Sequence, residues 1–139
     1  MKLSVKSDYA ARALIGLARH FHTGAALKIE GLAAENSIPA NYLVQILIEL
    51  KARALVKSVR GKEGGYLLAR PPADITLGDV VRAMHGQIFD SPALSDTQCP
   101  PELRAAWKKV QQAVNDAANA ITFQQLLDDS AGKREMYYI

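Results

Sequence analysis

The sequence is poor in cysteine and lacks a long hydrophobic run. Cys99 is the only cysteine in the chain, so no intrachain disulfide bond can form. No stretch of about 18 apolar residues is present, which argues against a transmembrane helix. The N-terminus also lacks the apolar segment and the cleavage site of a secretory signal. We therefore expect a cytoplasmic protein with no membrane partner.

Catalytic motifs are absent as well. The chain has no Ser-His-Asp elbow motif and no HExxH motif, and its single cysteine has no evident base. His20 and His22 are two residues apart, so on a helix they would point to different faces and could not pair on a metal ion. We predict neither an enzyme nor a metal site.

Hydrophobic residues make up 49% of the 139-residue chain, which is enough for one packed domain with an appended helix. Positive charge is concentrated in the first half. Lys and Arg outnumber Asp and Glu by about two to one in residues 1–70, whereas acidic residues are in excess in residues 71–139. A basic half indicates a polyanionic partner, although an uneven surface without a partner is the open alternative.

Apolar spacing predicts three helices in the first part of the chain. Ser7 is positioned to cap a first helix that runs to about His22. A short second helix is expected over residues 29–36. Pro39 is expected at the first position of a third helix, whose core face would comprise Leu43, Ile46, Leu47 and Leu50.

Two short strands are expected next, over residues 55–60 and 65–69, joined by a hairpin turn at residues 61–64. Three helices followed by a hairpin is the order of a winged helix-turn-helix domain. In that fold the third helix lies in the major groove of DNA, and the hairpin, or wing, contacts the neighbouring groove or backbone. Thr76 and Asp79 resemble a capping box that opens a fourth helix. We predict a mainly α fold with a small β-hairpin wing.

Polar and basic side chains in the third helix and the hairpin suit DNA binding. Asn41 and Gln45 can each form paired hydrogen bonds with an adenine edge, and the hydroxyl of Tyr42 can reach a phosphate. Arg60 at the wing tip suits a narrow minor groove. Lys28 is expected to lie outside the wing, so replacing Arg60 by alanine should weaken DNA binding more than replacing Lys28. These residues could also be ordinary surface residues. The predicted contacts from this reasoning are Ala40, Asn41, Tyr42, Gln45, Lys57, Arg60 and Lys62, and Lys51, Arg53 and Arg70 are further cations that would neutralise phosphates.

A long helix is predicted over residues 102–121, after a loop without periodicity at residues 86–101. Its apolar residues are spaced 4, 3, 4, 3 and 4 apart, which is a heptad seam typical of helix pairing. Packing on its own domain is the alternative. The predicted dimer interface comprises Leu103, Trp107, Val110, Val114, Ala117 and Ile121. The chain would divide into a DNA-binding domain (1–85), a sensor loop (86–101) and a dimerisation helix with a C-terminal tail (102–139).

The motif SVRGKEGGYLLARP, with NYLVQILIEL before it and ITLGDVVRAM after it, resembles the Rrf-two family of bacterial winged helix-turn-helix regulators, the IscR-, NsrR- and CymR-like proteins. The resemblance extends to MKLSVKSDYAARALIGLA and AITFQQLLDD near the ends of the chain. It implies a dimer that pairs through the long helix and binds two-fold-related promoter sites, and we expect a repressor. It also implies wing contacts by Arg60 and Gly61.

Many members of this family hold an iron–sulfur cluster in the loop before the dimer helix, on three cysteines. Here only Cys99 remains in that loop. Asp8 matches a position at which some members supply an acidic ligand, and His85 is a further donor. Because a two-iron cluster needs about four ligands, usually thiolates, we predict no cofactor, with an iron–sulfur cluster as the disfavoured alternative. Cys99 and Asp8 stay candidate sensor residues, with Cys99 either a buried structural residue, a reactive thiol or a metal ligand.

The sequence therefore predicts a dimeric, sequence-specific regulator that binds double-stranded DNA. The alternatives are a winged-helix adaptor that binds other proteins, or a regulator controlled by a bound partner protein. An adaptor has no need for the excess of Lys and Arg around the hairpin.

Overall fold

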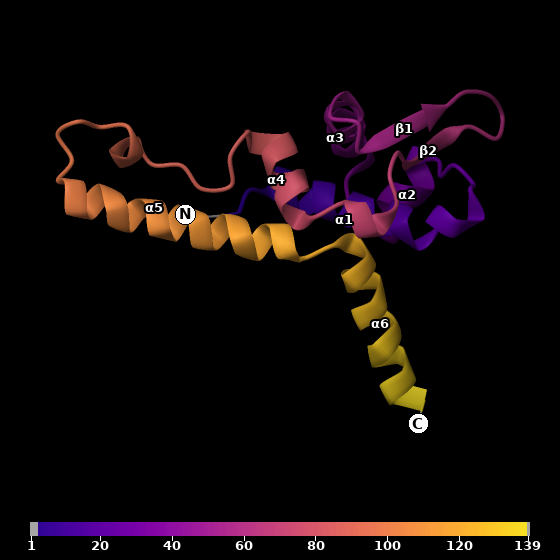
Figure 1. Ribbon diagram of the computed structural model, residues 1–139. Coiled ribbons are helices and arrows are strands. Elements are labelled where there is room, and N and C mark those ends of the chain that lie inside the picture. The colour runs from indigo at the N-terminus through magenta and orange to yellow at the C-terminus, as the bar shows by residue number, and fades with distance from the viewer. Residues whose placement is uncertain (1–2, 139) are drawn as a thin grey trace.

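The computed structural model describes the backbone of residues 3–138 and the side chains of residues 3–132. The fold is mainly α-helical with one two-stranded antiparallel sheet (Figure 1), which confirms the predicted fold class. Within the described residues, no helix is both long enough and apolar enough to cross a bilayer. The elements are α1 (Val5–Arg19), α2 (Ile29–Glu35), α3 (Ala40–Ala52), β1 (Val56–Val59), β2 (Gly65–Leu68), α4 (Leu77–His85), α5 (Pro101–Ala120) and α6 (Phe123–Tyr138).

The first helix begins one turn earlier than predicted. Ser4 has the extended backbone of a capping residue, and its hydroxyl accepts a hydrogen bond of 3.1 Å from the backbone N–H of Ser7. Ser7 is inside the first turn and is buried, so its assignment as the cap was wrong. The helix ends at Arg19 rather than near His22, which belongs to a short 3-10 turn. Pro39 precedes α3 as its N-cap and is not its first helical residue.

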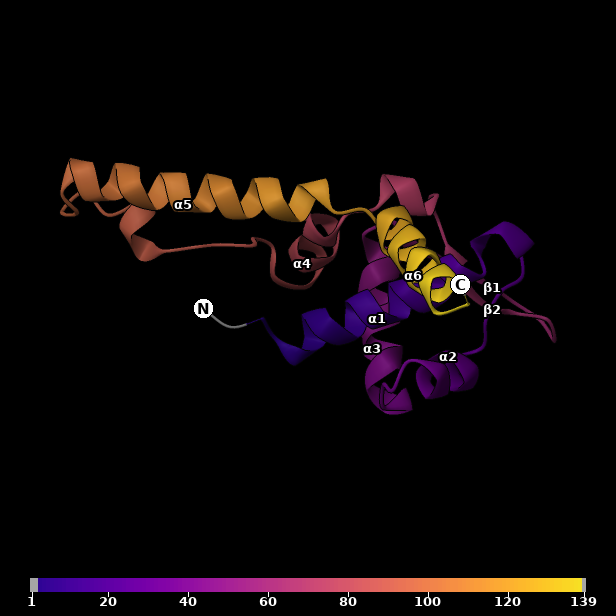
Figure 2. The same ribbon diagram turned by 90° about the horizontal axis from the view of Figure 1, so that it is seen from below.

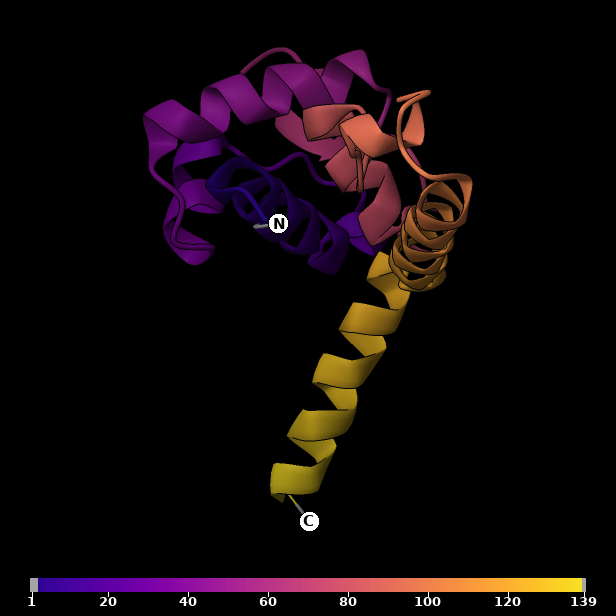
Figure 3. The same cartoon turned by 90° about the vertical axis from the view of Figure 1, so that its left-hand side faces the viewer.

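The core lies between α1, α2, α3, α4 and the strands. Its largest members have almost no solvent exposure, and burial of each leucine or isoleucine is worth about 1.5–3 kcal/mol. Figures 2 and 3 show α4 between α5 and the bundle of the first three helices. The arrangement therefore connects the N-terminal helices to α5 through α4. The large, fully buried residues include Leu14, Leu17, Leu32, Leu43, Leu47, Leu50, Ile75 and Phe123.

The hairpin is anchored to the segment that precedes α2. Its strands pair from Val56 with Leu68 to Val59 with Gly65. Leu27 and Tyr66 exchange two backbone hydrogen bonds of 2.8 Å each, which adds a third short segment beside β2. A Cβ atom at Gly65 would collide with the carbonyl oxygen of Leu27, so this close approach requires glycine. Strand β2 is thus hydrogen-bonded on both sides, to β1 and to the Leu27 segment.

The C-terminal helix α6 was not predicted. Figure 1 shows it turning away from the line of α5, after a link that is bound to the start of α4. The backbone N–H of Leu77 donates to Ile121, and that of Phe123 donates to Ile75, both at 3.0 Å. Phe123 is 1% exposed and belongs to the main core. The chain therefore returns to the N-terminal helices after α5, and Ile121 caps α5 instead of ending the helix proper.

Candidate nucleic-acid interface

One face of α3 is packed in the core and the opposite face is free of it. The core face is the predicted set of leucines and isoleucine, all of them buried. Asn41 and Gln45 are exposed on the other side, and Ala40 and Tyr42 are exposed at the start of the helix. Val44, at the edge of this surface, is half-buried. Figure 1 shows α3 next to the two strands, at the same side of the fold.

The side chain of Tyr42 packs against α1. Its ring contacts Tyr9 edge-on, with centroids 5.5 Å apart, and the guanidinium of Arg12 lies 5.5 Å from the Tyr9 ring. Tyr42 nevertheless keeps 40% of its surface exposed. A second tie joins the helices, because Lys6 Nζ lies 2.7 Å from Glu49 Oε2. These contacts orient α3 and leave its polar face accessible.

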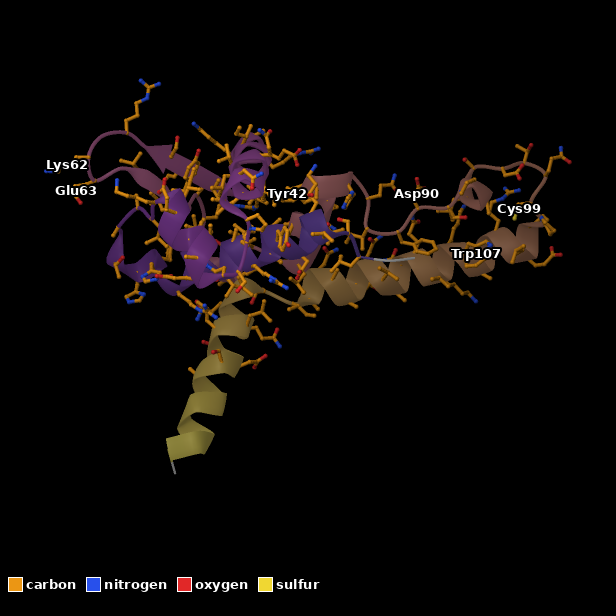
Figure 4. All side chains as sticks on the ribbon, turned by 180° about the vertical axis from the view of Figure 1, so that it is seen from behind. Tyr42, Lys62, Glu63, Asp90, Cys99 and Trp107 are labelled. Carbon is orange, nitrogen blue, oxygen red and sulfur yellow. The ribbon has the colours of Figure 1, made fainter. Side chains whose placement is uncertain are left out.

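The wing carries the predicted basic residues on its surface. Lys57, Arg60, Gly61 and Lys62 are all exposed, and Figure 4 shows Lys62 at the tip of the hairpin. Gly61 has a φ of +106°, which favours glycine at the turn. The prediction that Lys28 lies away from the wing is wrong. Its Nζ donates a hydrogen bond of 2.9 Å to the carbonyl oxygen of Lys62 at the wing tip. The tertiary fold therefore brings Lys28 to the wing.

Another lysine connects the wing to α3. Lys51 Nζ donates a hydrogen bond of 2.7 Å to the hydroxyl of Ser58 in β1. Nothing in the local sequence pattern of either residue indicates this link. Helix α3 and the wing are thus joined at one end, which favours a fixed spacing between them.

An ionic cluster lies at the start of α4, close to the end of β2. Thr76 and Asp79 form the predicted capping box, and Arg82 Nη2 donates to Asp79 Oδ1 at 3.1 Å. Arg70 Nη2 lies 4.0 Å from the other carboxylate oxygen. Partial burial opposes ionisation of Asp79, but the hydrogen bonds from Thr76 and Arg82 and the charge of Arg70 outweigh it and lower the pKa of this carboxyl.

Comparison with known proteins agrees with this geometry. The Rrf2 family model, described as an iron-dependent transcriptional regulator, matches residues 3–129. The chain belongs to the Rrf2 family. It is 33% identical over 137 residues to the HTH-type transcriptional regulator CymR of Bacillus subtilis (strain 168), which covers 99% of this chain and 97% of CymR. The family resemblance inferred from the wing motif is therefore confirmed.

Solved structures of Rrf2-family proteins have the same fold. The structure of CymR, described as the global cysteine regulator of B. subtilis, aligns with a TM-score of 0.80 and 32% identity over 91% of this chain and 95% of CymR. The structure of T. potens IscR aligns with a TM-score of 0.77 and 32% identity over 94% of this chain and 88% of IscR. The Rrf2-family chain is thus a DNA-binding transcription regulator with a winged-helix fold, in a family of regulators that are not enzymes.

The candidate sensor residues belong to different parts of the Rrf2 fold. Cys99 is 8% exposed and precedes α5, at the end of the molecule opposite the wing tip (Figure 4). Asp8 lies in α1, where its carboxylate is 2.9 Å from the guanidinium of Arg12. His85 Nε2 is engaged by the hydroxyl of Ser4 at 2.5 Å. Within one chain, these three residues therefore do not form a common site.

An iron–sulfur cluster does not fit these residues. Among the residues that the structure describes, no three His, Cys, Asp or Glu side chains converge as a metal site would require. Cluster irons are usually held by several thiolates, and each chain has one thiol. The expected absence of a cofactor stays a prediction.

The predicted dimer seam lies along an open face of α5. Leu103, Trp107 and Val110 are 46%, 37% and 42% exposed, whereas Val114 and Ile121 are half-buried and Ala117 is exposed. The sequence analysis missed Phe89, whose ring stacks on Trp107 with centroids 6.4 Å apart. Gln111 Nε2 donates to the Phe89 carbonyl at 3.1 Å. A single aromatic residue in a loop without periodicity offered no signal for this contact.

Proposed function

We propose that the chain acts as a homodimer that binds two-fold-related sites in double-stranded promoter DNA and represses transcription from them. The observation that carries this proposal is the exposed polar face of α3 beside the basic wing, on one side of the fold. A winged-helix protein uses these two elements to contact the major groove and the adjacent groove or backbone. Repression is the expected direction, because a bound dimer excludes other proteins from the promoter.

Two amides and one arginine would supply sequence preference. Asn41 and Gln45 can each donate to and accept from an adenine edge in the major groove. Arg60, exposed in the wing, suits the negative potential of a narrow minor groove. The remaining contacts would position the protein on the phosphate backbone. We assign these to Ala40, Tyr42, Lys57, Gly61 and Lys62.

Dimerisation would proceed through the seam of α5. Leu103, Trp107 and Val110 lie on one face of α5 and are between 37% and 46% exposed. They form an apolar strip that a second copy of the helix would cover. The exposed part of the strip runs from Leu103 to Val110, and the remaining surface of the helix carries polar residues such as Lys108 and Gln112. The pairing would place two recognition helices on one face of the duplex, as two-fold-related half-sites require.

Salt dependence of duplex binding tests the proposal. Fluorescence anisotropy with a labelled duplex from the upstream region of its own gene should show a log–log slope near −0.9 for each phosphate neutralised. Arg60→Ala should weaken binding, whereas Arg19→Ala, which removes an equal charge at the end of α1, should not. An absence of binding to any genomic duplex, or binding that ignores salt, would contradict the proposal. In vitro transcription with and without the protein measures repression directly.

We also propose that this regulator works without an iron–sulfur cluster. The support is the donor set, with one thiol in each chain and Asp8 already paired with Arg12. Protein purified without oxygen should be colourless and free of iron while it still binds DNA. A brown, iron-containing protein would show that the donor set was misjudged. Asp8→Ala and Cys99→Ser would then identify the ligands.

A further inference from the structure

Three arginines from separate parts of the chain line one hollow together with a carboxylate. Arg53 follows the end of α3, Arg70 follows β2, and Arg82 lies in α4. Together with Asp79 they line a hollow of about 260 Å³, which we call the arginine hollow. Arg82 and Arg70 both face Asp79, at 3.1 and 4.0 Å, whereas Arg53 is in no ion pair among the described residues. The arginine hollow therefore holds two positive charges more than its one carboxylate neutralises.

One donor in the arginine hollow is left without an acceptor. The Nε atom of Arg70 is buried and, within the part of the chain that the structure describes, has no hydrogen-bond partner. A buried donor of this kind, on a charged group, costs free energy unless a ligand or water accepts from it. Neither the capping box of α4 nor the DNA contacts proposed above use this atom. The arginine hollow thus combines excess charge with an unused donor.

A second hollow continues from the first. Arg82 and Gly86 line both, and the lining of the second, of about 310 Å³, includes four residues with amide side chains, Gln87, Gln112, Asn115 and Asn119. Amides donate and accept hydrogen bonds, so this surface suits the polar body of a small molecule whose anionic group lies among the arginines. The two hollows extend from the end of α3 to the side of α5.

We propose that the arginine hollow binds a phosphate group. Guanidinium groups bind phosphate through paired, charge-assisted hydrogen bonds, which favours arginine over other cations in such sites. A phosphate monoester carries about −1.5 to −2 at pH 7, which matches the two excess positive charges, whereas a phosphodiester of the DNA backbone carries one negative charge and would neutralise half of them. The phosphate comes either from a small phosphorylated molecule, whose body would occupy the second hollow, or from the DNA backbone.

Occupancy of the arginine hollow would affect DNA binding. One phosphate would bridge the end of the recognition helix, the end of the wing and α4, which packs against α5. Its binding would stabilise one relative arrangement of these elements over others. A ligand shifts such an equilibrium only by its difference in affinity for the two arrangements.

The first arm of the test uses inorganic phosphate and no DNA, so it does not depend on the proposed function. If a small molecule supplies the phosphate, calorimetry at constant ionic strength should show saturable binding of inorganic phosphate to the wild-type protein. Arg70→Gln and Arg53→Gln should each weaken it about tenfold or more, because each removes a charge-assisted contact. Arg19→Gln, which removes the same charge outside the arginine hollow, should leave phosphate binding unchanged. Thermal melting checks that each variant is folded, and Arg53→Gln is the safer variant because Arg53 is exposed.

The second arm uses duplex DNA in phosphate-free buffer and separates the two sources. If the DNA backbone supplies the phosphate, inorganic phosphate does not bind, and Arg53→Gln reduces the log–log salt slope by about one while Arg19→Gln does not. If a small molecule supplies it, inorganic phosphate binds and the salt slope is unchanged. Failure of phosphate to bind, together with an unchanged slope in a folded Arg53→Gln protein, overturns the proposal.

Discussion

Removal of the ring of Trp107 should weaken the proposed dimer by about three orders of magnitude. Trp107 is 37% exposed in the single chain, and of a side-chain surface of about 250 Å² this leaves about 90 Å² for a partner to cover. At about 25 cal/mol per Å², that area contributes about 2 kcal/mol per chain and about 4 kcal/mol per dimer. Since about 1.4 kcal/mol is tenfold in affinity, Trp107→Ala should raise the dimer dissociation constant about a thousandfold.

Sedimentation equilibrium over a wide concentration range measures this constant for the wild type and each variant. Two matched controls separate the seam from its surroundings. Lys109→Ala changes an exposed residue of the same helix off the seam, and should leave the constant unchanged. Phe89→Ala removes the stacked partner of Trp107 but no residue of the seam, and should have a much smaller effect. A wild-type protein that is monomeric at micromolar concentration, or a Trp107→Ala dimer as tight as the wild type, would refute the reasoning.

Three further predictions concern the wing, the recognition helix and α4. Lys28→Met should lower DNA affinity and increase hydrogen exchange at the wing, because it removes the bond to the Lys62 carbonyl; exchange equal to that of the wild type would argue against this role. Gln45→Ala should relax preference at particular base pairs by about 1–3 kcal/mol in a binding-site selection, and a uniform loss across sequences would instead indicate a backbone contact. Asp79→Asn should lower thermal stability at neutral pH by about 0.3–1 kcal/mol, because it removes the negative charge in the first turn of α4 while the Thr76 cap stays in place. That difference should shrink below about pH 4, since folding lowers the Asp79 pKa and its stabilisation is lost as the carboxylate is protonated; a difference independent of pH would contradict the assignment.

Local sequence patterns were sufficient to predict α3, the wing and the start of α4. The core stripe of α3, the turn glycines of the wing and the capping box of Thr76 each depend on residues within a few positions of one another. Their order along the chain then indicated the winged helix-turn-helix fold. Ser4 and Ser7 show the limit of this reasoning, because both can cap a helix, and only the backbone conformation at Ser4 decided between them.

The sequence by itself determined the helices α1 to α5, the hairpin and the family, because helical and strand periodicity, turn residues and a contiguous motif are all local properties. Only the tertiary structure decided that Phe123 returns to the core, that Lys28 supports the wing and that Phe89 covers Trp107. It also brought together Arg53 and its two arginine neighbours from separate elements. These contacts join residues far apart in the chain, and their formation depends on how the helices pack, which no periodicity of a single segment encodes.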